Sequence, residues 1–179
     1  MSGLDGRPLH GGVVTDVLIE PMTAADWPDV ERIYAAGIAT GLATFERGTP
    51  SWERFDTGHR PDGRFVARRR DDGRVVGWVA ASPYSARAAY AGVAWESVYV
   101  DPEAQGQGIG RRLLEHLIAV ADQVGLWTLC AGVMADNAAS LAVHERVGFR
   151  VVGVQERISQ DAAGRWRDVV LLERRRPGP

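Results

Sequence analysis

Hydrophobic and polar residues alternate over several short segments, the pattern of strands with one buried face. Two such runs in residues 64–82 flank Asp72-Gly73, a dipeptide that readily adopts the positive φ angles of a tight turn, so we predict a hairpin there. Further strand-like runs lie at 17–23, 95–100, 126–134, 149–159 and 167–175. A turn at Ala163-Gly164 is expected to join the last two.

Apolar residues recur at helical spacing in other segments. One helix is expected to have Thr23 or Asp26 near its start. Another runs from Arg111 toward Gly125, which is well placed to end it. A further helix opens at Asn137 and closes at Gly148, and Ser51 is placed to cap a short one.

The resulting order is β-α-(α)-β-β-β-α-β-α-β-β, which is not a regular βαβα alternation. It predicts the α/β class with mixed α+β character: one mixed sheet of about six to seven strands with helices on both faces. We expect residues 1–16 to be a poorly ordered Gly-rich extension, 17–174 a single domain and 175–179 a tail.

The composition of the 179-residue chain is that of an ordinary globular protein, with 45% hydrophobic and 25% charged residues. A net charge of −2 gives no overall attraction to nucleic acid or anionic membranes, and no apolar run approaches the ~20 residues that span a bilayer. Without a recognisable signal peptide, we expect a cytoplasmic protein. The single cysteine, Cys130, excludes an internal disulfide and is expected to be a small buried residue rather than a nucleophile.

Three alternating glycines lie where a strand should give way to a helix. Asp101-Pro102 stops the strand, and the glycines at 106, 108 and 110 let successive main-chain N–H groups converge on one point. The helix that follows adds its own unpaired N–H groups and the positive end of its dipole. Together these features predict an anion site suited to a diphosphate, with Arg111 at its rim. Neither the dinucleotide fingerprint nor the P-loop fits, because residue 111 is not glycine and no Gly-Lys-Ser/Thr occurs.

The segment Gln105-Gly106-Gln107-Gly108-Ile109-Gly110 resembles the acyl-CoA signature of the GNAT N-acetyltransferases. "NAASLAVHERVGF" is similar to the second signature of that superfamily, and "ATFERGTPS", "PYSARAAY" and "GRWRDVVLLER" resemble its phosphinothricin/methionine-sulfoximine branch. The resemblance implies a GNAT-like domain that uses acetyl-CoA (coenzyme A) and acetylates a primary amine of a small molecule. It also implies a homodimer. Phosphinothricin, methionine sulfoximine and methionine sulfone are the amino-acid analogues that it suggests as substrates.

The resemblance also assigns roles to residues. It implies that the main chain of Val98, Tyr99 and Val100 holds the acetyl-pantetheine arm. Asn137, Ser140 and His144 share one helix face by their spacing, and that stripe could face the same arm. The resemblance gives His144 the task of protonating the departing thiolate. Ala139, Val143 and Val147 lie on another face and are expected to pack on the sheet. Because the other histidines show no metal-ligand spacing, we predict no metal.

Substrate recognition in this branch involves a cationic and aromatic pair, which the resemblance places at Arg87 and Tyr90. Arginine suits a carboxylate because its guanidinium donates two parallel hydrogen bonds. Phe45 and Glu46 are expected to line the same pocket, and Trp95 could fill part of it.

Glu96 is the candidate base, but the branch usually has its glutamate one position earlier, where this chain has Trp95. Alternation would put Trp95, Ser97 and Tyr99 on one face of the strand and Glu96 on the other. Three hypotheses remain open. Glu96 acts through a local bulge or an ordered water; Glu46 or a water chain replaces it; or the chain accepts a different amine.

The leading hypothesis is an acetyl-CoA-dependent N-acetyltransferase. Two alternatives remain open. Trp95 at the usual base position would suit an acyl-CoA-binding module without useful catalysis. Acetylation of protein N-termini or lysines would require an open acidic groove, and the sequence does not indicate one.

Overall fold

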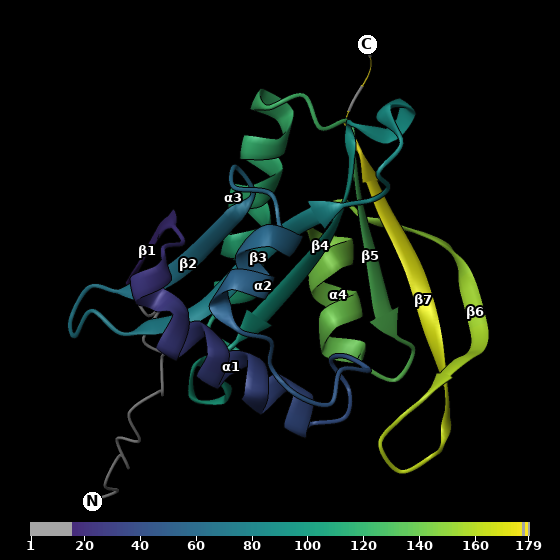
Figure 1. Cartoon of the computed structure of the whole chain (residues 1–179), viewed down its shortest axis with the longest axis horizontal. Helices are drawn as coiled ribbons and strands as arrows, with labels where there is room; N and C mark the ends of the chain where they lie inside the picture. The colour runs from purple at the N-terminus through teal and green to yellow at the C-terminus, as the bar shows by residue number, and fades with distance from the viewer. Residues whose placement is uncertain (1–15, 177, 179) are drawn as a thin grey trace, which may run out of the picture.

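The structure is a computed structural model that describes residues 16–176 and 178. Seven strands form one sheet, and helices cover both of its faces (Figure 1). The expected order of elements and the mixed sheet are therefore confirmed. The expected N-terminal extension lies outside the described residues except for Asp16, and the tail lies outside them in part.

The strands and helices follow in chain order. The strands are β1 (Val17–Pro21), β2 (Arg64–Arg69), β3 (Val75–Pro83), β4 (Val93–Val100), β5 (Thr128–Met134), β6 (Arg150–Gln160) and β7 (Trp166–Arg175). The α-helices are α1 (Trp27–Ala39), α2 (Trp52–Gly58), α3 (Ile109–Gln123) and α4 (Ala138–Arg146). Short 3-10 turns are η1 (Ala24–Asp26), η2 (Ala88–Tyr90) and η3 (Pro102–Ala104).

The predicted helix and turn boundaries have the expected physical causes. The Ser51 side chain accepts a hydrogen bond from the Arg54 N–H and so caps α2. Gly73, Gly125 and Gly148 have φ angles of +74°, +81° and +92°, which glycine adopts without the steric cost that other residues incur. The hairpin turn and the ends of α3 and α4 therefore lie where the sequence predicted them.

The sheet has the order β1-β2-β3-β4-β5-β7-β6, and β4 with β5 is its parallel pair. These two strands pair only over Val93–Trp95 and Thr128–Cys130, at the N-terminal ends of both strands. Beyond these residues no ladder joins them, so β4 and β5 diverge into a wedge (Figure 1). This wedge positions the candidate site.

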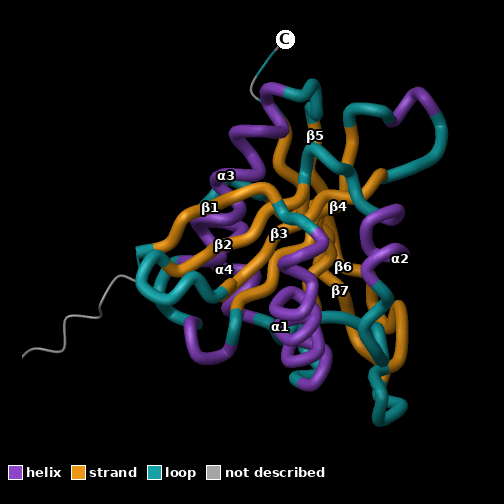
Figure 2. The backbone as a smooth tube through the Cα atoms, turned by 60° about the vertical axis from the view of Figure 1, so that its left-hand side comes forward, coloured by secondary structure: helices purple, strands orange, loops and turns teal. Residues whose placement is uncertain are grey.

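Two hydrophobic clusters hold the helices to the sheet. On one face, α3 contributes buried leucines such as Leu113 and Leu117. On the other, α1 and α2 pack Val30, Ile33 and Phe55 against the sheet. Figure 2 shows α1 and α3 on opposite sides of the strands.

The side chains of β4 alternate between these two clusters. Tyr99 stacks on Trp78 with ring centroids 4.5 Å apart, on the α1 face, whereas Val98 and Val100 pack against the cluster that contains α3. The register of β4 with β3 runs unbroken from Ala94 to Val100. The bulge considered for residues 94–97 is therefore absent from this part of the described chain, and Glu96 lies on the face of Val98.

Candidate active site

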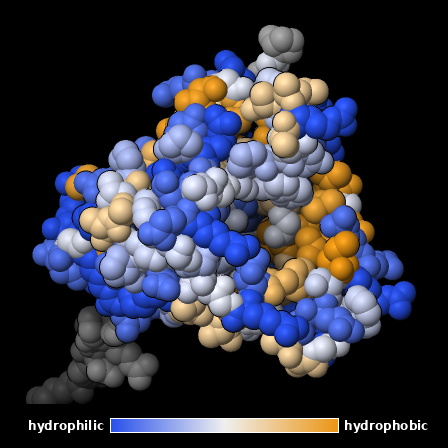
Figure 3. Space-filling view, in the orientation of Figure 1, coloured by the Kyte–Doolittle hydropathy of each residue, from blue (hydrophilic) through white to orange (hydrophobic). Residues whose placement is uncertain are grey.

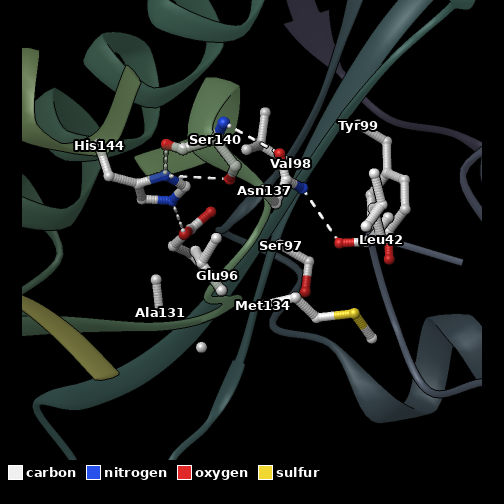
Figure 4. A pocket seen from close by; sticks show the side chains of 13 residues that line it. Leu42, Glu96, Ser97, Val98, Tyr99, Ala131, Met134, Asn137, Ser140 and His144 are labelled. Carbon is white, nitrogen blue, oxygen red and sulfur yellow. Dashed lines mark hydrogen bonds and ion pairs between the residues drawn. The ribbon is translucent and has the colours of Figure 1, made fainter. Parts of the chain in front are cut away.

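Glu96 of β4 and His144 of α4 form a buried hydrogen-bonded pair. His144 Nε2 lies 2.6 Å from Glu96 Oε1, and the two side chains are 2% and 1% exposed. Figure 4 shows them pointing toward one another across the wedge. The pair exists because strand alternation directs Glu96 to the α4 face, where no bulge is needed.

The hydrogen bonds of His144 define where its protons lie. Nδ1 is 2.7 Å from the Ser140 carbonyl oxygen, which can only accept, so Nδ1 carries a proton and donates it. Nε2 and Glu96 Oε1 then share a second proton. Burial alone lowers the pKa of His144, but the hydrogen bond and charge of Glu96 and the bond to Ser140 outweigh it. The net effect raises that pKa, which favours an imidazolium beside a carboxylate.

The second carboxylate oxygen of Glu96 is left without a hydrogen-bond partner in the part of the chain that the structure describes. Oε2 is buried and accepts no hydrogen bond from the described residues. Leaving such an acceptor unpaired costs free energy, so an unpaired buried oxygen points to a donor supplied by a ligand. Glu96 also lines a cavity of about 70 Å³ between β4 and β5. The unpaired oxygen and the cavity therefore form one site.

The cavity occupies the wedge. It is lined by β4 residues 96–99, β5 residues 131–134, three polar residues of the α4 segment, and Leu42 and Ala43. The molecular surface is hollowed over this region, with strongly hydrophobic residues along one border (Figure 3). Because β4 and β5 do not pair here, the main chain of Val98, Tyr99 and Val100 has no β5 partner on this side.

Asn137 and Ser140 bring the start of α4 to the same cavity. The Asn137 side chain accepts from the Ser140 N–H at 3.2 Å and donates from Nδ2 to the Leu42 carbonyl at 3.1 Å. The predicted polar stripe of Asn137, Ser140 and His144 thus faces the wedge. Ala139 is exposed, contrary to expectation, whereas Val143 and Val147 do pack on the core.

The glycine turn before α3 leaves its amides free. Gly106 and Gly108 have φ angles of +76° and +77°. In residues 16–176, the main-chain N–H groups of 106–111 donate to no protein acceptor, and the first helical amide with a partner is that of Arg112, which donates to Gly108 O at 3.1 Å. A Cβ at position 106 or 108 would meet nothing within 4 Å. The turn therefore combines unpaired main-chain donors with open space beside the Cα atoms of Gly106 and Gly108.

Polar side chains near the turn differ in their hydrogen-bond partners. Gln107 Oε1 is buried without a partner, while its Nε2 donates to the Glu103 carbonyl at 3.4 Å. Arg111 forms an exposed ion pair with Glu115 at 2.7 Å, so its guanidinium has a partner on its own helix. Gln105 follows η3 in an extended conformation, and Ile109, the first residue of α3, is buried.

The predicted substrate residues fall into two groups. Arg87 lies 5.6 Å from the ring centroid of Tyr90, and Tyr84 links this ring to Trp95 at 5.5 Å and 5.4 Å. This cluster belongs to the β3–β4 connection and the start of β4, at the upper end of the sheet in Figures 1 and 2.

Phe45 and Glu46 belong instead to the connection between α1 and α2. That connection lies beside the lower end of α4, at the other end of the wedge (Figure 1). Its residues Leu42 and Ala43 line the cavity of Glu96, although no periodic pattern or motif in the sequence marks them.

Comparisons with known proteins agree on one family. Residues 27–149 match the model of the acetyltransferase (GNAT) family. The chain is 37% identical over 160 residues to phosphinothricin N-acetyltransferase of Alcaligenes faecalis, covering 83% of this chain and 77% of that protein. This chain belongs to the GNAT acetyltransferases.

Solved structures of GNAT proteins share the fold closely. A phosphinothricin acetyltransferase from Sinorhizobium meliloti in complex with AcCoA has a TM-score of 0.81 at 30% identity, covering 89% of this chain and 88% of that chain. The ribosomal-protein-alanine N-acetyltransferase from Brucella melitensis has a TM-score of 0.80 at 32% identity, covering 89% of this chain and 99% of that one. The chain is thus an acetyl-CoA-dependent N-acetyltransferase.

The residues of this GNAT chain fit acetyl-CoA. The open turn at Gly106 and Gly108 and its unpaired amides suit the polar diphosphate end. The unpaired edge of β4 in the wedge suits the amide-bearing arm. Bound acetyl-CoA supplies an acetyl thioester that an amine can attack.

Other groups offer no competing chemistry. Cys130 is half-buried, and burial followed by the charge of Glu173 raises the pKa of its thiol, so it stays protonated near neutral pH. Residues 16–176 contain no group of three His, Cys, Asp or Glu side chains placed to hold a metal ion. No helix of the described chain is long and apolar enough to cross a membrane.

Proposed function

We propose that this protein acetylates the primary amine of a small amino-acid analogue, such as phosphinothricin, methionine sulfoximine or methionine sulfone, with Glu96 as the proton acceptor. The observation that carries the role of Glu96 is its buried, unpaired Oε2 in the wedge, held in place through Oε1 by His144. Two relatives support this substrate class, because one is named phosphinothricin N-acetyltransferase and the other L-methionine sulfoximine/L-methionine sulfone acetyltransferase.

The amine is an ammonium at neutral pH and loses two protons in this mechanism. Oε2 of Glu96 takes the first from the ammonium and passes it to solvent, which frees the lone pair that attacks the thioester carbon. The second leaves the nitrogen as the amide forms, and Oε2 transfers it to the sulfur that departs. His144 has both ring nitrogens engaged by Ser140 O and Glu96 Oε1. We therefore assign His144 to positioning Glu96, and not to protonating the thiolate directly.

The other residues bind and orient. The amides of 106–111 hold the diphosphate, and Gln105 and Arg111 border it. The main chain of Val98, Tyr99 and Val100 holds the acyl arm, with Asn137 and Ser140 on the opposite side of the wedge. Backbone donors aimed at the thioester carbonyl stabilise the negative charge that develops there.

Coenzyme A release tests the proposal. We expect the purified protein to release free thiol from acetyl-CoA when phosphinothricin, methionine sulfoximine or methionine sulfone is added. Acetyl-CoA binding measured by calorimetry, without turnover of any of the three amines, would instead favour the acyl-CoA-binding module. The similarity to a ribosomal-protein-alanine N-acetyltransferase makes a peptide with N-terminal alanine the second substrate class to assay.

We also propose a homodimer formed through β6. This strand is at the edge of the sheet, and its Val151, Val152, Val154 and Ile158 are 57%, 53%, 54% and 50% exposed. Figure 3 shows strongly hydrophobic residues gathered over β6 and β7. Apolar side chains along an open sheet edge favour pairing with another chain. The cytoplasmic location remains a prediction from the sequence.

The dimer is testable by one substitution. Val154→Lys should shift the sedimentation mass from two chains to one, because it puts a charge in the apolar edge, whereas Glu156→Lys on the same strand should not. A wild-type protein that sediments as a single chain contradicts the proposed dimer.

A further inference from the structure

A second cavity lies next to the catalytic wedge and is larger than the first. It measures about 300 Å³, at the lower end of the range of small-molecule sites, against about 70 Å³ for the cavity at Glu96. The smaller cavity has room for an acyl group but not for a whole amino-acid analogue as well. The rest of the substrate needs a neighbouring space.

The two cavities adjoin through two tyrosines. Tyr34 lines the second cavity and Tyr99 the first, and their ring centroids are 5.0 Å apart. The same connection between α1 and α2 borders both cavities, with Leu42 and Ala43 on the wedge and residues 46 and 48–50 on the second cavity. A small molecule that lies along this connection would therefore reach both cavities.

The second cavity is lined by side chains of both charges. Glu46 lines it together with Tyr34, and burial followed by the charge of Glu46 raises the pKa of that tyrosine. Arg54 of α2 also lines the cavity, and no carboxylate within the described chain forms an ion pair with it. The cavity is thus lined by a carboxylate of the α1–α2 connection, which also borders the wedge, and by a cation of α2.

His59 adds no charge to this arrangement. Its Nδ1 lies 2.7 Å from the Phe55 carbonyl oxygen and donates to it, and burial is the main cause that lowers the pKa of the imidazole. Arg54 is then the cation of the cavity, and Phe55, which is 2% exposed, forms a rigid apolar wall.

We propose that this second cavity binds the oxyanion at the far end of a small zwitterionic substrate, with Arg54 as its partner and the substrate amine directed past Tyr34 toward Glu96. This inference rests on the proposed N-acetyltransferase function and specifies its substrates. Among the proposed substrates it favours phosphinothricin, which carries a phosphinate several bonds from the amine, over methionine sulfoximine and methionine sulfone, whose distal groups are uncharged. Arg87 is then not required for this group, because it lies in a different connection.

The experiment compares Arg54→Gln with Arg47→Gln, an exposed arginine of the same region that does not line the cavity. Phosphinothricin carries a distal anion, and norleucine has an apolar side chain of similar length. We expect Arg54→Gln to raise the KM for phosphinothricin at least tenfold, and to leave the KM values for norleucine and acetyl-CoA within about twofold. The KM of Arg54→Lys for phosphinothricin should lie between those of the wild type and Arg54→Gln, because lysine keeps the positive charge but lacks the planar guanidinium.

Calorimetry separates failure of this site from failure of the reaction. Phosphinothricin should bind the wild-type protein in the presence of coenzyme A, and Arg54→Gln should weaken that binding at least tenfold. If Arg54→Gln and Arg47→Gln have the same KM and the same affinity for phosphinothricin, the second-cavity site is wrong, while the proposed reaction stands. If Arg54→Gln weakens the binding of phosphinothricin but the wild-type protein does not acetylate it, the site is supported and the proposed reaction is contradicted.

Discussion

At the scale of single residues, the pairing of Glu96 with His144 resolves the position of the candidate base. The glutamate is one residue later than its branch usually has it, and so it lies on the opposite face of β4 from Trp95. On that face it meets the imidazole of α4 and keeps one oxygen for a ligand. Trp95 stacks on Tyr84 instead, and becomes part of an aromatic cluster with Tyr90.

This pair makes stability depend on pH. The folded-state pKa of His144 is raised above its unfolded value of about 6.5, so its stabilisation is complete below that pH and is lost as pH rises through the folded pKa. We expect the unfolding free energy of the wild type to fall more steeply than that of Glu96→Gln as pH rises from 6.5 to 9. Urea unfolding at several pH values measures this.

The control for that comparison is Glu20→Gln, which removes a carboxylate paired with Arg68 at the surface. Its stability should follow the wild-type pH dependence. Parallel curves for wild type and Glu96→Gln would show that the buried pair does not carry a linked proton.

At the scale of elements, the turn before α3 needs a left-handed backbone conformation at Gly108. Gly108 and Gly73 have nearly the same left-handed φ, +77° and +74°, and a Cβ at either would meet nothing within 4 Å. They differ in position: Gly108 opens α3, whereas Gly73 turns the β2–β3 hairpin.

Gly108→Ala and Gly73→Ala should therefore lose similar stability, about 1 kcal/mol each, from the strain of the left-handed conformation. Only Gly108→Ala should weaken acetyl-CoA binding, by at least tenfold, because its methyl group enters the open space of the turn that carries the free amides. Calorimetric titration with acetyl-CoA checks this. Equal affinities for the two variants would place the diphosphate elsewhere.

The elements also show what the sequence could predict. Gly125, Gly148 and the Ser51 cap are local signals, so the helix ends were found from neighbouring residues alone. The alternation of side chains along a strand correctly predicted that Glu96 and Trp95 lie on opposite faces of β4. The partner of Glu96 could not be predicted, because it depends on how α4 packs against β4, and His144 lies 48 positions further along the chain.

Other parts of the site had no sequence signal. Leu42 contributes a carbonyl oxygen, which any residue has, so nothing in its identity marks the contact with Asn137. The bulge considered for β4 was wrong because the strand has a suitable partner for Glu96 on its regular face. Arg54 was overlooked because one exposed arginine on a short helix resembles any surface arginine.

At the scale of the whole molecule, the fold brings two open features together. The divergence of β4 from β5 leaves a strand edge available, and the turn at the end of β4 leaves a set of amides available. Both lie on one path along β4, which is how a long cofactor such as acetyl-CoA can present its acetyl group beside Glu96. The exposed edge at β6 is separate from this path and suits a partner chain.

The pH–rate profile of Glu96→Gln tests the central claim most directly. With a saturating concentration of acetyl-CoA, we predict a thiol-release rate at pH 7 at least about 100-fold below wild type, because the amine loses its proton acceptor. The deficit should narrow toward high pH, where the amine deprotonates unaided, while Glu20→Gln behaves as wild type. A Glu96→Gln profile that superimposes on the wild-type profile would contradict the account.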